Sequence, residues 1–189
     1  MERNRFANAY IPFDGSSFVR RLVQELTDVL QEVIGPQEAR GFIALVGARI
    51  GDAFNTAYRR AAGNRPLVRE EAADAMIDLK RRIGGDFHVI AQTDEEILLG
   101  NRRCPFGESV RGRPALCMMT SNVFGRIAAE NLGYAKVVVE EAIAEGAPGC
   151  RVRILLEASK RLDSVAGREY FRVGPLDGSE VLADARAGP

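Results

Sequence analysis

The stretch Gly84-Gly85-Asp86-Phe87-His88-Val89-Ile90-Ala91-Gln92 decides the fold, because the apolar period of the chain changes there. Before the two glycines, apolar residues recur every three to four positions, which is typical of amphipathic helices. After them, Phe87, Val89 and Ala91 alternate with the residues between them, which suits a strand with one preferentially buried face. The change predicts a helical half followed by a sheet.

The residues before this stretch predict three helices. Apolar side chains recur at helical spacing in each of them, and the glycine and proline that follow the first helix stop its pattern. Ser16 or Ser17 carries the hydroxyl that the N-cap of the first helix needs. The three helices are expected over residues 16–34, 37–62 and 68–83.

The first two helices carry more apolar surface than one small sheet can easily cover. Gly47 and Gly51 lie one turn apart in the second helix, so one face of it permits close approach of another backbone. That face fits either packing within the domain, a subunit contact or a ligand. We expect a homodimer built mainly from the helical half through a two-fold interface.

The residues after the stretch predict the rest of the sheet and one inserted helix. A turn at 93–95 and a return strand at 96–100 form a hairpin with the first strand. A Gly-, Arg- and Pro-rich loop then leads to a helix over 115–132, and further strands are expected at 136–141, 150–157 and 169–173. The order predicts an α+β fold, with an N-terminal helical half on a small antiparallel sheet of four to five strands and one inserted helix.

Length and composition are those of one globular domain. The 189 residues are 46% hydrophobic and 28% charged, which is ordinary for a soluble protein with a sizeable core. We expect an N-terminal arm over residues 1–15, a single domain over 16–158 and a partly flexible C-terminal extension over 159–189.

The charge balance and the absence of certain segments exclude several classes of protein. The 26 Lys and Arg residues match the 26 Asp and Glu residues, whereas a nucleic-acid binder normally shows a basic excess. No apolar run is long enough to span a membrane, and the N-terminus lacks the apolar core of a signal peptide. An odd number of cysteines without such a signal fits a reducing compartment. We therefore expect a cytoplasmic protein that binds neither membranes nor nucleic acid directly.

The three cysteines are the strongest candidates for a functional site. Cys104 opens a loop, Cys117 lies at the start of a predicted helix and Cys150 at the start of a predicted strand, and these positions can meet at one end of the sheet. Thiols are soft ligands, and three of them together favour zinc or an iron–sulfur cluster. The alternative is that they are small buried apolar residues. His88, the single histidine, is a candidate fourth metal ligand.

The sequence lacks the motifs of several common enzyme classes. It contains no Gly-rich phosphate loop, no HExxH motif and no serine nucleophile elbow. Glu140 and Glu141 are adjacent on a predicted strand, so they point to opposite faces and cannot act as a carboxylate pair. We expect a binding or sensor module that is not an enzyme.

The order of the parts resembles a family of sensory domains. After Gly-Gly-Asp-Phe come a hairpin, the loop Cys104-Pro105-Phe106, a helix led by Cys117, the strand Val137-Val138-Val139-Glu140-Glu141 and a closing strand led by Cys150. This series looks like the 4-vinyl-reductase-type domain and its relative, the methanogen output domain. Both are related to the ligand-binding fold of haem nitric-oxide sensors and Golgi tethering subunits. The resemblance implies a sensor domain that signals to a partner protein such as a kinase or a transcription regulator.

A narrower resemblance concerns the cysteines alone. Repressors of iron–sulfur assembly genes have a Cys-Pro opening, a second cysteine about a dozen residues later and a third before a terminal strand. Cys104, Cys117 and Cys150 follow this order, although the chain lacks the winged-helix half of those repressors. The resemblance implies an iron–sulfur cluster, such as a 4Fe–4S cluster, or zinc as the alternative. The domain would then relay a redox, gas or ligand state.

Two other functions remain open from the sequence. The first is a regulatory module for a small hydrophobic ligand, with structural zinc or no metal. Its pocket is expected between the helical half and the sheet, lined by Phe42, Phe87, Met118 and Phe124. The second is an accessory reductase-like protein.

Overall fold

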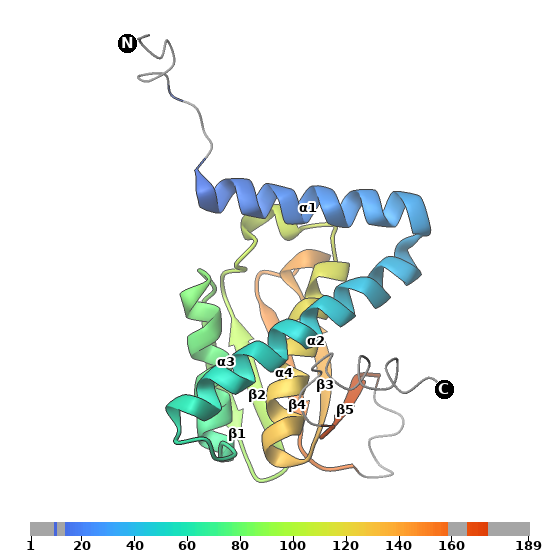
Figure 1. Cartoon of the computed structure of the whole chain (residues 1–189). Helices are drawn as coiled ribbons and strands as arrows, with labels where there is room; N and C mark the ends of the chain where they lie inside the picture. Colours follow the sequence, from blue (N-terminus) through green and yellow to red (C-terminus); the bar gives the residue numbers. More distant parts are fainter. Residues whose placement is uncertain (1–9, 11–13, 159–165, 174–189) are drawn as a thin grey trace, which may run out of the picture.

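The computed structural model describes residues 10, 14–158 and 166–173, which form helices packed on one face of a sheet (Figure 1). The predicted α+β class is confirmed, because four α-helices in the described residues pack against a five-stranded antiparallel sheet. Most of the predicted arm at 1–15 and of the predicted extension at 159–189 lies outside the described residues. The helices are α1 (Gly15–Ile34), α2 (Pro36–Ala61), α3 (Arg69–Arg82) and α4 (Ala115–Leu132). The strands are β1 (Phe87–Gln92), β2 (Glu96–Asn101), β3 (Tyr134–Glu141), β4 (Cys150–Leu155) and β5 (Arg168–Phe171), with short 3-10 helices η1 (Gly107–Val110) and η2 (Ile143–Glu145).

The first helix begins at a capping box whose N-cap is Asp14, not Ser16 or Ser17 as expected. The Asp14 carboxylate accepts a hydrogen bond from the backbone N–H of Ser17 at 2.7 Å. In return, the Ser17 hydroxyl oxygen accepts one from the backbone N–H of Asp14 at 2.8 Å. Asp and Ser are comparable N-caps, so the sequence alone did not separate the two starts, and the reciprocal pair decides for the earlier one.

The sheet has the strand order β1-β2-β4-β3-β5, and every neighbouring pair is antiparallel. Phe87 in β1 is paired with Asn101 in β2, which is paired in turn with Cys150 in β4. Residues directly opposite each other across antiparallel strands present their side chains on the same face. These three side chains therefore form a row at one end of the sheet.

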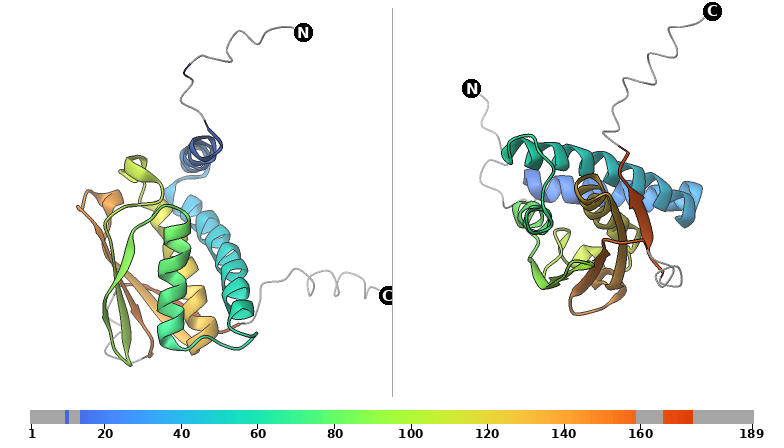
Figure 2. Two further views of the ribbon diagram at one scale, coloured as in Figure 1. Left: turned by 90° about the vertical axis from the view of Figure 1, so that its left-hand side faces the viewer. Right: turned by 90° about the horizontal axis from the view of Figure 1, so that it is seen from below.

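The helices cover one face of the sheet in layers, as the left view of Figure 2 shows. Helices α3 and α4 lie next to the sheet, and α2 crosses over α4. A Cβ atom built on Gly47 of α2 would lie 3.0 Å from the Cα atom of Met119 in α4, and one built on Gly51 would lie 3.2 Å from the Cα atom of Val123. The small-residue face of α2 thus packs inside the chain and does not form the expected subunit contact.

Two apolar clusters fill the interior. The larger one joins α3, α4 and the sheet, and the fully buried Met76, Phe124 and Ile154 belong to it. The smaller one comprises Val110, Leu116 and the segment 142–144, and the three cysteines pack against it. No helix in the described part of the chain has the length and apolar character needed to cross a membrane.

The close crossing of α2 and α4 predicts opposite effects of alanine at two glycines of α2. Gly47→Ala should lower the free energy of unfolding by about 1–3 kcal/mol, because the new methyl group meets α4 backbone. Gly41→Ala is the matched control in the same helix. Gly41 has nothing within 4 Å of a built Cβ, so alanine should raise the free energy of unfolding by about 0.5–1 kcal/mol. Urea denaturation measures both. Equal changes in the free energy of unfolding for the two variants would contradict the close packing of α2 on α4.

Candidate functional site

The three cysteines line one small cavity between the sheet and the start of α4. Its volume is about 30 Å³. Cys104 follows β2, Cys117 lies in the first turn of α4 and Cys150 is the first residue of β4. The remaining lining is mostly apolar, with Asn101 and Thr120 as its other polar side chains, and consists of Phe87, Pro105, Phe106, Val110, Leu116, Val139, Ala142 and Val152.

Hydrogen-bond donors fix the position of the Cys150 sulfur. The side-chain amide of Asn101 donates to Cys150 Sγ at 3.7 Å, and the backbone N–H of Ile143 donates to it at 3.5 Å. The Asn101 side chain is itself held, because its Oδ1 accepts from the backbone N–H groups of Asp86 at 3.1 Å and Arg103 at 3.2 Å.

Two of the thiols, those of Cys104 and Cys117, are poor acids. Burial raises the pKa of Cys117 to about 12, and the charges of Cys150 and Cys104 add to this effect. Burial also raises the pKa of Cys104. Since the thiolate is the reactive and ligating form, Cys104 and Cys117 are protonated and unreactive near neutral pH.

A buried lysine lies behind the cavity and interacts electrostatically with these thiols. Lys80 of α3 is only 4% exposed, and its Nζ donates a hydrogen bond to Thr120 Oγ1 at 2.7 Å. The ammonium also lies 5.3 Å from the ring centroid of Phe124 and 5.6 Å from that of Phe87. Such cation–π contacts partly compensate for lost hydration.

The charge environment of Lys80 consists of the cysteines. Burial lowers the pKa of Lys80 to about 8, and the three cysteines act in the opposite direction. Within the described residues, no carboxylate forms an ion pair with Lys80. Sequence reasoning missed this residue, although a signal was present. Lys80 falls four and eight residues after Met76 and Ala72, which are buried on the apolar side of α3.

The cavity as it stands does not support the expected iron–sulfur cluster. A volume of about 30 Å³ holds about two water molecules, whereas a four-iron cluster has a core of eight atoms. As the side chains stand, no group of three or more His, Cys, Asp or Glu residues in the described ranges could hold a metal ion. Three thiols remain a suitable donor set for one soft ion once they ionise and turn inward.

His88 does not lie with the cysteines. Successive side chains of a strand point to opposite faces, and the preceding residue, Phe87, faces the cavity. His88 is paired with Gly100, and a Cβ built on that glycine would lie 2.7 Å from His88 Nε2. The imidazole therefore packs on the outer side of the sheet, and the predicted fourth ligand is not placed to reach the site.

The four residues predicted to line a ligand pocket are only partly brought together. Phe87 lines the cavity, and Phe124 packs behind it with its ring at 5.3 Å and nearly perpendicular. Phe42 is 59% exposed on α2. Met118 of α4 does not line the cavity, although its neighbour Cys117 does.

The sequence of residues 22–155 matches the family model described as Methanogen output domain 1. The chain belongs to the methanogen output domain 1 family. This match confirms one part of the expected family relationship, and it covers the helices, the cysteine loop and four of the five strands. Strand β5 lies outside the matched residues.

The fold is also similar to that of a solved structure. The structure is a trafficking protein particle complex subunit 3 from Naegleria fowleri covalently bound to palmitic acid. The TM-score is 0.54 at 13% identity, and the match covers 76% of this chain and 95% of that chain. At this identity the likeness concerns the fold alone. No curated protein matches the methanogen output domain chain.

Replacing Lys80 should alter the acidity of the thiols. In Lys80→Met the ammonium that favours the thiolates is gone, so Cys104 and Cys117 should ionise at higher pH. Alkylation by iodoacetamide at pH 8, followed by peptide mass spectrometry, should slow by about threefold, which corresponds to roughly half a pKa unit.

Lys136→Met provides the matched control, because Lys136 is a buried lysine of β3 whose Nζ lies 3.4 Å from Glu169. Its alkylation rates should equal those of the unmodified protein. Unchanged rates in Lys80→Met would show that the ammonium does not act on the cysteines.

Proposed function

We propose that the chain is a signalling domain that senses one soft divalent metal ion of the zinc class at Cys104, Cys117 and Cys150. One observation carries the proposal, namely that a buried lysine without a carboxylate partner in the described residues lies behind a cavity lined by three thiols. A buried charge is costly unless an opposite charge lies near it. Ionised cysteines would supply that charge.

The formal charges favour a divalent ion. Three thiolates, one divalent cation and one ammonium together carry no net charge. A neutral set is what an apolar cavity accepts at least cost. Without the ion, the raised pKa values of Cys104 and Cys117 keep these thiols protonated. Binding of the ion must therefore displace thiol protons.

The same charges link metal binding to movement. Because the thiols do not converge as they stand, binding requires Cys104 and the first turn of α4 to approach Cys150. The segment between Cys104 and Cys117 contains η1 and joins these two anchors. Loss of the ion would release the segment and change the surface that a partner kinase or regulator contacts, as in other order–disorder switches. In this proposal the domain acts by binding and not by catalysis.

A second candidate is an acyl-chain sensor. The lining of the cavity is largely apolar, and the similar trafficking subunit carries covalently bound palmitic acid. At about 30 Å³ the cavity would have to open between α4 and the sheet to admit a chain. Incubation with palmitoyl-CoA followed by intact mass spectrometry separates the candidates, because an acyl sensor gains mass on a cysteine and a metal sensor does not.

Cobalt titration tests the metal proposal. The anaerobic, reduced protein should bind one Co²⁺ with the near-ultraviolet absorbance of thiolate–cobalt charge transfer, and Zn²⁺ should displace it. Affinity should rise between pH 6 and pH 8, because the raised thiol pKa values make binding release protons. Cys117→Ser and Lys80→Met should each weaken binding by about tenfold or more.

His88→Ala is the control for the cobalt titration, since His88 lies on the other face of the sheet from the cavity. Its affinity should equal that of the unmodified protein. Absence of the charge-transfer absorbance, or an unchanged affinity in Cys117→Ser, would contradict the proposal.

Hydrogen exchange tests the proposed movement. Zinc should slow amide exchange across residues 102–120, because it holds both ends of the segment, and should leave α2 unchanged. In Cys117→Ser zinc should have no effect on these amides. A zinc-bound protein with the exchange pattern of the metal-free protein would show that the segment does not respond to the site.

A further inference from the structure

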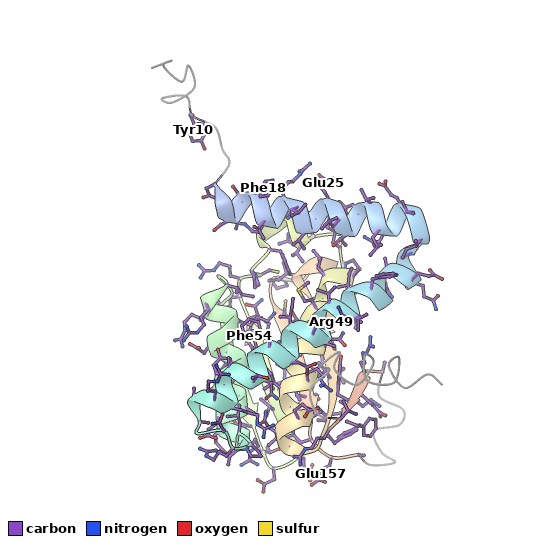
Figure 3. All side chains as sticks on the ribbon, viewed as in Figure 1. Tyr10, Phe18, Glu25, Arg49, Phe54 and Glu157 are labelled. Atoms are coloured by element: carbon purple, nitrogen blue, oxygen red, sulfur yellow. The ribbon has the colours of Figure 1, made fainter. Side chains whose placement is uncertain are left out.

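Helix α1 presents a continuous apolar stripe to solvent. Six of its large apolar side chains are 44–76% exposed, and their spacing of three to four residues places them on one side of the helix. Figure 1 shows α1 crossing one end of the molecule, and Figure 3 labels Phe18 on it. The stripe consists of Phe18, Val19, Leu22, Leu26, Val29 and Val33. An apolar patch of this extent is unusual on a monomer and marks an interaction surface.

The opposite side of α1 is already used by the domain. Asp28 forms a bidentate ion pair with the Arg113 guanidinium, with N–O distances of 2.7–3.1 Å. The Gln24 side-chain amide donates to the Ser109 hydroxyl oxygen, and Val23 packs against the cluster that holds the cysteines. The outward stripe is therefore not needed to attach α1 to its own chain.

We propose that a second copy of this chain covers the stripe, with the two α1 helices antiparallel about a two-fold axis near Leu26. The charged residues beside the stripe support this occupant. Arg21, Glu25 and Glu32 are exposed and lie along the same flank of α1, at spacings of four and seven residues.

An antiparallel pair brings this flank against the same flank of the other copy in reverse order. Arg21 near the start of one helix then lies opposite Glu32 near the end of the other, and two-fold symmetry repeats the contact. A parallel pair would place each flank against the opposite, uncharged flank. In the antiparallel arrangement Arg21 and Glu32 are thus complementary across the pair, while Glu25, near the axis, forms an ion pair with Arg21 of its own helix.

The pairing would also link metal binding at the cysteine cavity to the dimer interface. This step rests on the proposed function. The inner contacts of α1 are made to Ser109 and Arg113, which lie between Cys104 and Cys117. A metal ion that fixes this segment would fix α1 as well and reduce the entropy that pairing must remove. Zinc should therefore strengthen the dimer, and by linkage the dimer should bind zinc more tightly.

Sedimentation equilibrium of the full chain tests the pairing without metal. The unmodified protein should be a dimer at micromolar concentration, and Leu26→Glu should raise the dissociation constant at least 100-fold. Arg21→Glu and Glu32→Arg should each raise it about tenfold, and the double variant should recover to within about threefold, because both contacts exchange sign. Ile90→Glu, at an exposed apolar residue of β1, is the control and should leave it unchanged.

The outcomes distinguish the pairing of α1 from its coupling to zinc. A monomeric protein at 100 μM, on the order of the weakest specific pairs, would overturn the pairing, and a double variant as weak as the single ones would overturn the antiparallel arrangement. A dimer whose dissociation constant does not change in zinc, in a protein that binds cobalt, would overturn the coupling alone. Failure to bind cobalt would overturn the proposed function and leave the metal-free pairing intact.

Discussion

The buried ammonium of Lys80 is the constraint around which the centre of this domain is built. Helix α3 supplies it, α4 supplies its hydroxyl partner Thr120, and Phe87 and Phe124 supply aromatic faces. None of these partners carries a negative charge, so burial still lowers the pKa of Lys80 to about 8. The three thiols across the cavity are the groups able to balance the charge, and they do so only when ionised.

The same arrangement explains why the thiols come from three distant parts of the chain. The strand order places the start of β4 beside the end of β2, which brings Cys150 next to Asn101. The loop after β2 carries Cys104, and the helix that follows begins with Cys117 in its first turn. The loop between these two cysteines also holds the inner side of α1 through Asp28 and Arg113. A change at the cavity therefore reaches the helix with the most exposed apolar side chains.

Local apolar periodicity accounts for the helices and strands that were predicted correctly from the sequence. The helix at 115–132 has the predicted bounds, and β1 begins after Gly84-Gly85 as the change of period indicated. Strand alternation also predicts the position of His88, because a buried Phe87 places the next side chain on the other face of the sheet. The methanogen output domain part of the family expectation was confirmed by the match over residues 22–155.

Features that depend on tertiary contacts were not predictable in this way. Helical spacing predicted that Phe42 lines a pocket, but it could not show that this residue of α2 is exposed to solvent. It could not show that Gly47 meets α4 of the same chain. It could not show that Lys80 is buried either, because burial of a charge depends on partners from other elements. The small size of the cavity follows only from the packed side chains.

The central claim is that metal-bound thiolates are the counter-charge of Lys80, and nitrogen NMR of its labelled side chain tests this most directly. Titration of the metal-free protein should give a pKa of about 8 for Lys80. With one equivalent of zinc, the nearby thiolates should stabilise the ammonium and raise this pKa by at least about one unit. A Lys80 pKa that zinc leaves unchanged would contradict the account.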